Sequence, residues 1–186
     1  MRSSASPLYE PLNEYKHFGP HIGLVDGPLE YLTMAGFRLP LPFTTRMTVV
    51  QLANGDLFLH SPIAFNPELA RQLSSGGRVR HLVSPNQFHY AHVGEWSRAF
   101  PDAITWASPH ARERARARGI EVQFKRDLGE QVPDDWRSEI DRRPFQAEFS
   151  GNSSFSTGSP ERSYSQTPLL TSSSKSSRSP GALLRL

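Results

Sequence analysis

The pattern of apolar and polar residues predicts short strands that alternate with helices between residues 21 and 118. Segments of about four to eight residues in which apolar side chains alternate or run together are typical of strands. Such segments are residues 21–25, 45–52, 56–60, 79–83 and 104–107. Helix-like apolar spacing occurs at residues 67–76, 93–100 and 109–118. Helices that alternate with apolar strands indicate an α/β fold, α+β in type, in which helices cover a sheet.

The clearest turn signal lies between two of these strands. Asn54-Gly55 separates residues 45–52 from residues 56–60. This dipeptide favours the positive φ angles of a type I′ turn, so the two strands should form a β-hairpin.

The first helix has recognisable ends. Asn66, Pro67 and Glu68 supply an N-cap, a proline at the first helical position and an acidic first turn. Gly76 and Gly77 follow the last apolar position, where glycine ends helices. The sequence therefore predicts a helix from Pro67 to this glycine pair.

The two ends of the chain carry weaker patterns around a predicted domain at residues 19–149. Residues 1–18 are expected to form an extended arm, and residues 131–140 one helical turn that buries the ring of Trp136. Thirteen of the 37 residues from 150 to 186 are Ser. Such a segment buries too little apolar area to offset its chain entropy, so we expect a disordered tail.

Charge gives no indication of a nucleic-acid partner. The chain of 186 residues has 21 Lys plus Arg and 18 Asp plus Glu, a net charge of +3. Residues 150–186 contain four of the cations and one of the acids, so residues 1–149 are electrically balanced. The run Arg112, Arg114, Arg116 and Arg118 has a spacing that scatters the side chains around a helix. A basic face for phosphate groups is not predicted.

The absence of cysteine excludes disulfides and thiolate ligands and fits a reducing compartment. Residues 1–7 lack the apolar run of a signal peptide, and residues 31–43 are too short and too rich in Pro, Gly and Arg to span a bilayer. We therefore expect a cytoplasmic protein with no membrane partner. The sequence also lacks the motifs of serine hydrolases, nucleotide-binding loops and helical zinc proteases.

Candidate chemistry is concentrated in residues 83–96, VSPNQFHYAHVGEW. The segment runs from a predicted strand through an irregular loop into a predicted helix, and such loops often build sites. It resembles the metal-binding loop of the metallo-β-lactamase fold, whose pattern His-x-His-x-Asp-His precedes an apolar residue and Gly. The alignment is anchored on residues 92–94. The four ligand positions of the pattern then fall on Gln87, His89, Ala91 and His92.

A longer resemblance covers residues 9–149. The segments that carry it are residues 42–43, 46–50, 54–62, 85–86, His89 and residues 94–96. They are similar to a family of uncharacterised proteins, a domain of unknown function, that is related to metallo-β-lactamases but lacks their full metal motif. The resemblance implies an αββα sandwich, of which this chain contains only the N-terminal half.

The substituted positions imply loss of metal chemistry. A catalytic zinc needs about three protein ligands and a water. Ala91 offers no lone pair, and the neutral amide of Gln87 suits harder cations better than zinc. In the family the first two positions help bind one ion and the last two the second, so each ion would lose a ligand. The resemblance therefore implies a catalytically inactive protein without a cofactor.

The alternative is a metal-dependent hydrolase with an atypical site for zinc or another divalent metal. His89 and His92 are its first two ligands, and His60, at the end of a predicted strand, is a third candidate. The competing interpretation is that these histidines bind no metal and form hydrogen bonds to backbone groups instead. The rim of the site would include Asn86, Gln87 and Glu95. Glu95 is either a general base or an exposed acid that favours the helix dipole.

The resemblance also implies a missing half, because the related fold continues where the Ser-rich tail begins. A reading-frame shift near Phe149 and a native disordered tail are the two explanations left open. Without its second half, the sheet face that carries Val49, Leu57 and Leu59 should be partly uncovered. An exposed apolar face of this kind predicts self-association.

Overall fold

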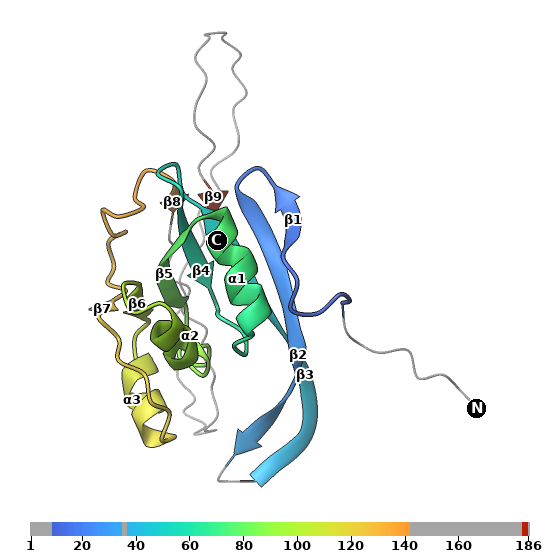
Figure 1. Ribbon diagram of the computed structural model, residues 1–186. Helices are drawn as coiled ribbons and strands as arrows, with labels where there is room; N and C mark the ends of the chain where they lie inside the picture. Colours follow the sequence, from blue (N-terminus) through green and yellow to red (C-terminus); the bar gives the residue numbers. More distant parts are fainter. Residues whose placement is uncertain (1–8, 35–36, 142–183, 186) are drawn as a thin grey trace, which may run out of the picture.

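A seven-stranded sheet lies at the centre of the computed structural model, which describes residues 9–34, 37–141 and 184–185 (Figure 1). Its strands follow the sequence order across the sheet. They are β1 Lys16–Gly19, β2 Ile22–Met34, β3 Phe37–Gln51, β4 Asp56–His60, β5 Arg78–Ser84, β6 Ile104–Ala107 and β7 Arg126–Asp127. A separate pair joins β8 (Ile140–Asp141) to β9 (Leu184–Arg185). The helices of the described residues are α1 Pro67–Gly76, α2 Val93–Ala99 and α3 Ala111–Ala117.

The sheet changes from antiparallel to parallel at β4. Strands β1 to β4 pair antiparallel, whereas β4 to β7 pair parallel. Each parallel step needs a crossover. The helices α1, α2 and α3 lie in the crossovers that follow β4, β5 and β6. The predicted alternation of strands and helices is confirmed here, and the fold is a mixed α and β arrangement.

The N-terminal strands β2 and β3 are longer than predicted, and β3 begins earlier. β1 begins within the segment expected to be an extended arm, and β2 and β3 extend far beyond residues 21–25 and 45–52. Together β2 and β3 form a hairpin that projects past the other strands (Figure 1). Tyr31, Leu41 and Phe43 are exposed in this projecting part. At its described positions, residues 28–31 and 41–44, the side chains are half-buried or exposed with no buried alternate positions, so sequence periodicity could not reveal it.

The β3–β4 hairpin is confirmed, but its turn is not type I′. The Gly55 amide donates to the Leu52 carbonyl oxygen, and the Leu52 amide donates to the Asp56 carbonyl oxygen, both at 2.8 Å. Gly55 has φ 83°, whereas Asn54 does not adopt a positive φ. This geometry is a three-residue loop, a type I turn followed by a glycine bulge. The Asn54 side chain favours it by accepting a hydrogen bond from the Asp56 amide at 2.9 Å.

The predicted start of α1 is confirmed in atomic detail. Asn66 is the N-cap, and its Oδ1 accepts a hydrogen bond from the Leu69 amide at 2.9 Å. Pro67 occupies the first helical turn, where its missing N–H costs nothing. Leu69 and Leu73 are buried against the sheet.

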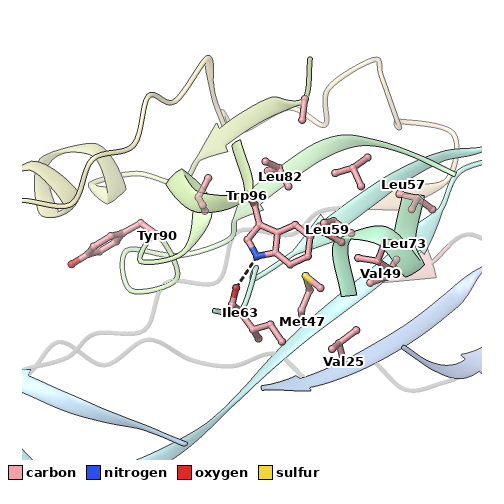
Figure 2. Close-up of a cluster of buried hydrophobic side chains, with 14 of the residues drawn as sticks. Val25, Met47, Val49, Leu57, Leu59, Ile63, Leu73, Leu82, Tyr90 and Trp96 are labelled. Atoms are coloured by element: carbon pink, nitrogen blue, oxygen red, sulfur yellow. Dashed lines mark hydrogen bonds between the residues drawn. The ribbon is translucent and has the colours of Figure 1, made fainter. Parts of the chain in front are cut away.

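One face of the sheet forms the larger core with α1 and α2 (Figure 2). Val49, Leu57 and Leu59 lie in this core and are 2%, 4% and 0% exposed. The predicted uncovered face is therefore wrong for these residues, because the apolar sides of α1 and α2 already cover them. Trp96 of α2 is fully buried among them, and its Nε1 donates to the Ile63 carbonyl oxygen at 2.8 Å.

The opposite face of the sheet is covered by the segment after β7. Trp136 is buried, as predicted, and its ring packs edge-on against Phe58 and Trp106. His81 of β5 lies in the same aromatic group, where its Nδ1 accepts a hydrogen bond from Trp106 Nε1 at 3.2 Å. Burial lowers the pKa of His81 to about 4. The imidazole is therefore neutral in the folded protein at pH 7.

Three further expectations can be compared with the fold. Residues 134–139 form hydrogen-bonded turns, and the Ile140 amide donates to the Trp136 carbonyl oxygen at 2.9 Å, which closes the single helical turn expected here. Within the described residues, no helix has the length and apolar composition needed to cross a membrane. The expected tail at residues 150–186 lies outside the described residues apart from β9.

Two glycines provide a test of the β3–β4 turn. Gly55→Ala should lower the free energy of unfolding by about 1 kcal/mol, because an added Cβ disfavours φ 83° although open space surrounds it. Gly76→Ala is the matched control, since it also meets open space but ends a helix at ordinary φ. It should be neutral or stabilise by up to about 1 kcal/mol. Urea unfolding measures both, and equal effects would contradict the assigned turn.

His81 should make the stability of the fold depend on pH. Its pKa of about 4 in the folded state lies below the ordinary 6.5, so only the unfolded chain takes up this proton between those values. The neutral His81 therefore contributes about 3 kcal/mol to the free energy of unfolding. This contribution is complete above pH 6.5 and is lost as the pH falls toward 4. His81→Gln should reduce the slope of unfolding free energy against pH by about 1.2 kcal/mol per unit near pH 5.5. Denaturant titrations at several pH values measure this slope, and an unchanged slope would refute the assignment.

Candidate functional site

The carboxyl ends of β4 and β5 lie side by side and carry the predicted polar residues. His60 is the last residue of β4 and pairs with Val83 of β5. Ser61 follows, and its amide donates to the Val83 carbonyl oxygen at 3.0 Å. Ser61 adopts φ 57°, in the left-handed region that non-glycine residues seldom occupy, and is only 7% exposed. The chain therefore makes a sharp, strained bend directly after His60.

The loop after β5 returns His89 to this bend. Ser84 Oγ donates to the Asn86 carbonyl oxygen at 3.0 Å, and Asn86 Oδ1 accepts from the Phe88 amide at 2.9 Å. These turns direct His89 toward β4, where its Nδ1 lies 2.6 Å from Ser61 Oγ. Two of the predicted metal ligands are thus near each other, but the Ser61 hydroxyl lies between them.

We call His60, Ser61 and His89 the histidine–serine cluster. Ser61 Oγ lies 3.2 Å from His60 Nδ1 and 2.6 Å from His89 Nδ1. Burial, followed by the nearby His89, lowers the pKa of His60 to about 4. His89 is exposed as a residue, but its Nδ1 side lies against Ser61, and this partial burial lowers its pKa as well. Both imidazoles are therefore neutral at pH 7.

His92 belongs to a different group. It precedes α2, and its Nε2 bonds to a carboxylate oxygen of Glu30 in β2. Its Nδ1 lies 3.4 Å from Glu95 Oε2. Burial alone would lower the pKa of His92, but hydrogen bonds and charge from Glu30 and then Glu95 raise it above its ordinary value. His92 therefore joins the β2–β3 hairpin to the start of α2.

Glu95 and the arginines also have structural roles. Glu95 lies in the first turn of α2, and its Oε2 accepts a hydrogen bond from the Phe65 amide at 3.3 Å. Arg112 binds Asp127, whereas Arg114 stacks over Phe88. The arginine side chains are therefore scattered around α3, as predicted from their spacing.

The donor set does not fit a catalytic zinc. Within residues 9–34, 37–141 and 184–185, no group of three or more His, Asp or Glu side chains could hold a metal ion. The Nδ1 atoms of His60 and His89 are directed at Ser61, and both ring nitrogens of His92 are directed at carboxylates. Ala91, which the resemblance predicted to be a ligand position, has no donor atom in its side chain. A zinc site with three protein ligands would require these side chains to rearrange.

Two residues of this region were missed by sequence reasoning. Ser61 was not selected, although it lies directly between a strand-end histidine and a proline, where the chain must leave the sheet. Glu30 was missed because β2 was predicted to end at residue 25, nine residues before its last residue, Met34. No local sequence signal pairs Glu30 with His92, which is 62 positions away.

Comparison with known families gives this arrangement a classification. The family model described as Domain of unknown function (DUF4336) matches residues 36–174. The chain therefore belongs to this family. The matched region includes β3, the histidine–serine cluster and all three described helices, and it continues beyond the change of composition at residue 150. No curated protein matches the chain.

The opposite pKa directions of the site histidines can be measured. His60 should stay neutral down to about pH 4, whereas His92 should take up its proton above its ordinary 6.5. Glu30→Gln removes the principal carboxylate partner of His92, so it should lower the pKa of His92 while leaving that of His60 in place. Histidine nitrogen chemical shifts followed by NMR measure both. If the two histidines protonated together, the assignment would fail.

Proposed function

We propose that this chain is a metallo-β-lactamase-like domain that has lost metal-dependent hydrolysis and acts through binding. The order of its elements supports the likeness. An antiparallel hairpin leads into parallel strands joined by helices, and a histidine-containing loop follows β5. Loops at the carboxyl ends of parallel strands are common positions for sites. The Gln87 and Ala91 substitutions support the loss of metal chemistry.

The observation that carries this proposal is the separation of the histidines into two groups. His60 and His89 share the Ser61 hydroxyl, whereas His92 bonds to Glu30 and Glu95. A metal ligand needs a ring nitrogen free to face the ion. Both ring nitrogens of His92 are already used, and their carboxylate partners favour the protonated imidazolium, which cannot bind a metal.

The histidine–serine cluster is suited to binding an uncharged polar group. Its two imidazoles are neutral at pH 7 and offer hydrogen bonds without a net charge. Phe88 precedes His89 in the same loop and is 52% exposed, so it offers apolar surface although Arg114 lies over its ring. The combination favours a ligand with a carbonyl or hydroxyl group and an apolar part.

A metal-dependent hydrolase is the second candidate, and one feature favours it. Ser61 contacts the Nδ1 atoms of both His60 and His89. Metal-binding histidines commonly have one nitrogen held by such a partner while the other binds the ion. The two Nε2 atoms would then be ligands, and a third would have to come from a rearranged His92 or Asn86.

Metal content separates the two candidates. The full chain, purified without a histidine tag, should contain less than about 0.1 equivalent of zinc, iron or manganese by mass spectrometry, because two ligands hold such ions poorly. The double variant His89→Ala and His92→Ala should give the same background. About one equivalent in the native chain, lost in the double variant, would overturn the proposal and favour the metal-dependent candidate.

A further inference from the structure

Ser61 combines three properties that a structural serine does not need. Its backbone is in the left-handed region, its side chain is buried, and its hydroxyl lies between two imidazole nitrogens. A left-handed non-glycine residue costs roughly 1–3 kcal/mol and persists where the surrounding structure enforces it, often at a site of chemistry. Glycine would satisfy the bend without this cost. The chain keeps a hydroxyl here instead.

The hydroxyl has one proton for two imidazole neighbours. It can donate to one Nδ1 and must accept from the other, so the two rings must be different tautomers. The contact to His89 is the shorter, 2.6 Å against 3.2 Å to His60. The shorter contact fits donation from Ser61 Oγ to a lone pair on His89 Nδ1, with His60 donating its Nδ1 proton to Ser61.

From this geometry we propose that Ser61 is a nucleophile with His89 as its general base, and that the pair cleaves short-chain esters or thioesters without a metal. A hydroxyl within hydrogen-bond distance of a base is the arrangement that activates serine. The inference goes beyond the binding role proposed above, because it adds a covalent reaction to the same cluster. It restricts the acyl group to a short one, since Ser61 is only 7% exposed beside the exposed His89.

The reaction balances with water as the only co-substrate. Ser61 Oγ forms a bond to the carbonyl carbon as its proton passes to His89 Nδ1. The bond from that carbon to the alkoxide or thiolate then breaks, and the leaving group takes the proton from His89. Water next gives a proton to His89 and attacks the acyl group. The carboxylic acid leaves, and the proton returns to Ser61 Oγ.

A small organophosphorus fluoride tests the nucleophile directly. The full chain is incubated with diisopropyl fluorophosphate in the presence of EDTA, and the adduct is located by intact mass and peptide mapping. One adduct on Ser61 is expected. Ser61→Gly, which suits φ 57°, should give none at this position. His89→Gln retains a hydrogen-bond acceptor but no base, and should slow labelling by about 100-fold or more.

The matched control is Ser108→Ala. Ser108 is also a buried serine directly after a parallel strand, but its hydroxyl has no hydrogen-bond partner among the described residues. The variant should be labelled on Ser61 at the native rate. An unlabelled Ser61 in the native chain, or equal rates for the native chain and His89→Gln, would overturn the proposal.

The acyl preference and the metal question have separate readouts. With the native chain, p-nitrophenyl acetate should give a burst of p-nitrophenol, and the Ser61→Gly variant should give none. p-Nitrophenyl dodecanoate should give no burst with the native chain. A burst with dodecanoate alone would refute the short-chain assignment. Because EDTA is present throughout, labelling of Ser61 reports the serine chemistry even if the metal measurement overturns the proposed function.

Discussion

The parallel pairing of β4 with β5 is the constraint on which the rest of the structure depends. Leu59 of β4 and Leu82 of β5 are paired, and both are fully buried. A parallel pair needs a crossover connection, and it is buried only if both of its faces are covered. The crossover helix α1 covers one face, and the segment after β7 covers the other. The same pairing places the ends of the two strands at one edge. His60, Ser61 and the loop that carries His89 meet there for this reason.

The projecting β2–β3 hairpin has a polar contact with that edge. Glu30 lies on the hairpin and bonds to His92 at the start of α2. At the other end of the hairpin, Asp26 is buried and bonds to both Lys16 and Arg46, which lowers its pKa against the opposing effect of burial. A two-stranded ribbon is only marginally stable by itself in water. The contact between Glu30 and His92 therefore joins the ribbon to the start of α2, and the ion pairs of Asp26 join β2 to β1 and β3.

Histidines in this fold are separated by their surroundings into different chemical states. His81 and His60 are kept neutral by burial, whereas the carboxylates around His92 favour its charged form. The same residue type thus serves as an acceptor in an aromatic core, as part of a hydroxyl-bridged cluster and as an ionic link. The contacts that distinguish these states include neighbours 25 to 62 positions away in sequence, in addition to the adjacent Ser61 and the nearby Glu95.

The sequence by itself determined the elements whose ends are marked by local chemistry. Asn66 and Pro67 predicted the first turn of α1, and the apolar run at residues 104–107 predicted β6 with the correct bounds. Such signals succeed because capping and strand burial act over a few neighbouring residues. The same locality explains why the prediction of a hairpin at Asn54-Gly55 was correct while its turn type was not, since two turn types use nearly the same residues.

Only the tertiary structure decided the site and the extent of β2 and β3. His60, His89 and His92 were selected from the sequence as one set, but folding places the first two around Ser61 and the third against Glu30. The burial of Val49, Leu57 and Leu59 was likewise decided by the helices that pack over them. Periodicity reports which side chains prefer to be buried. It carries no information on which distant polar atoms a given ring nitrogen will meet, because that distance is set by strand pairing and crossover geometry.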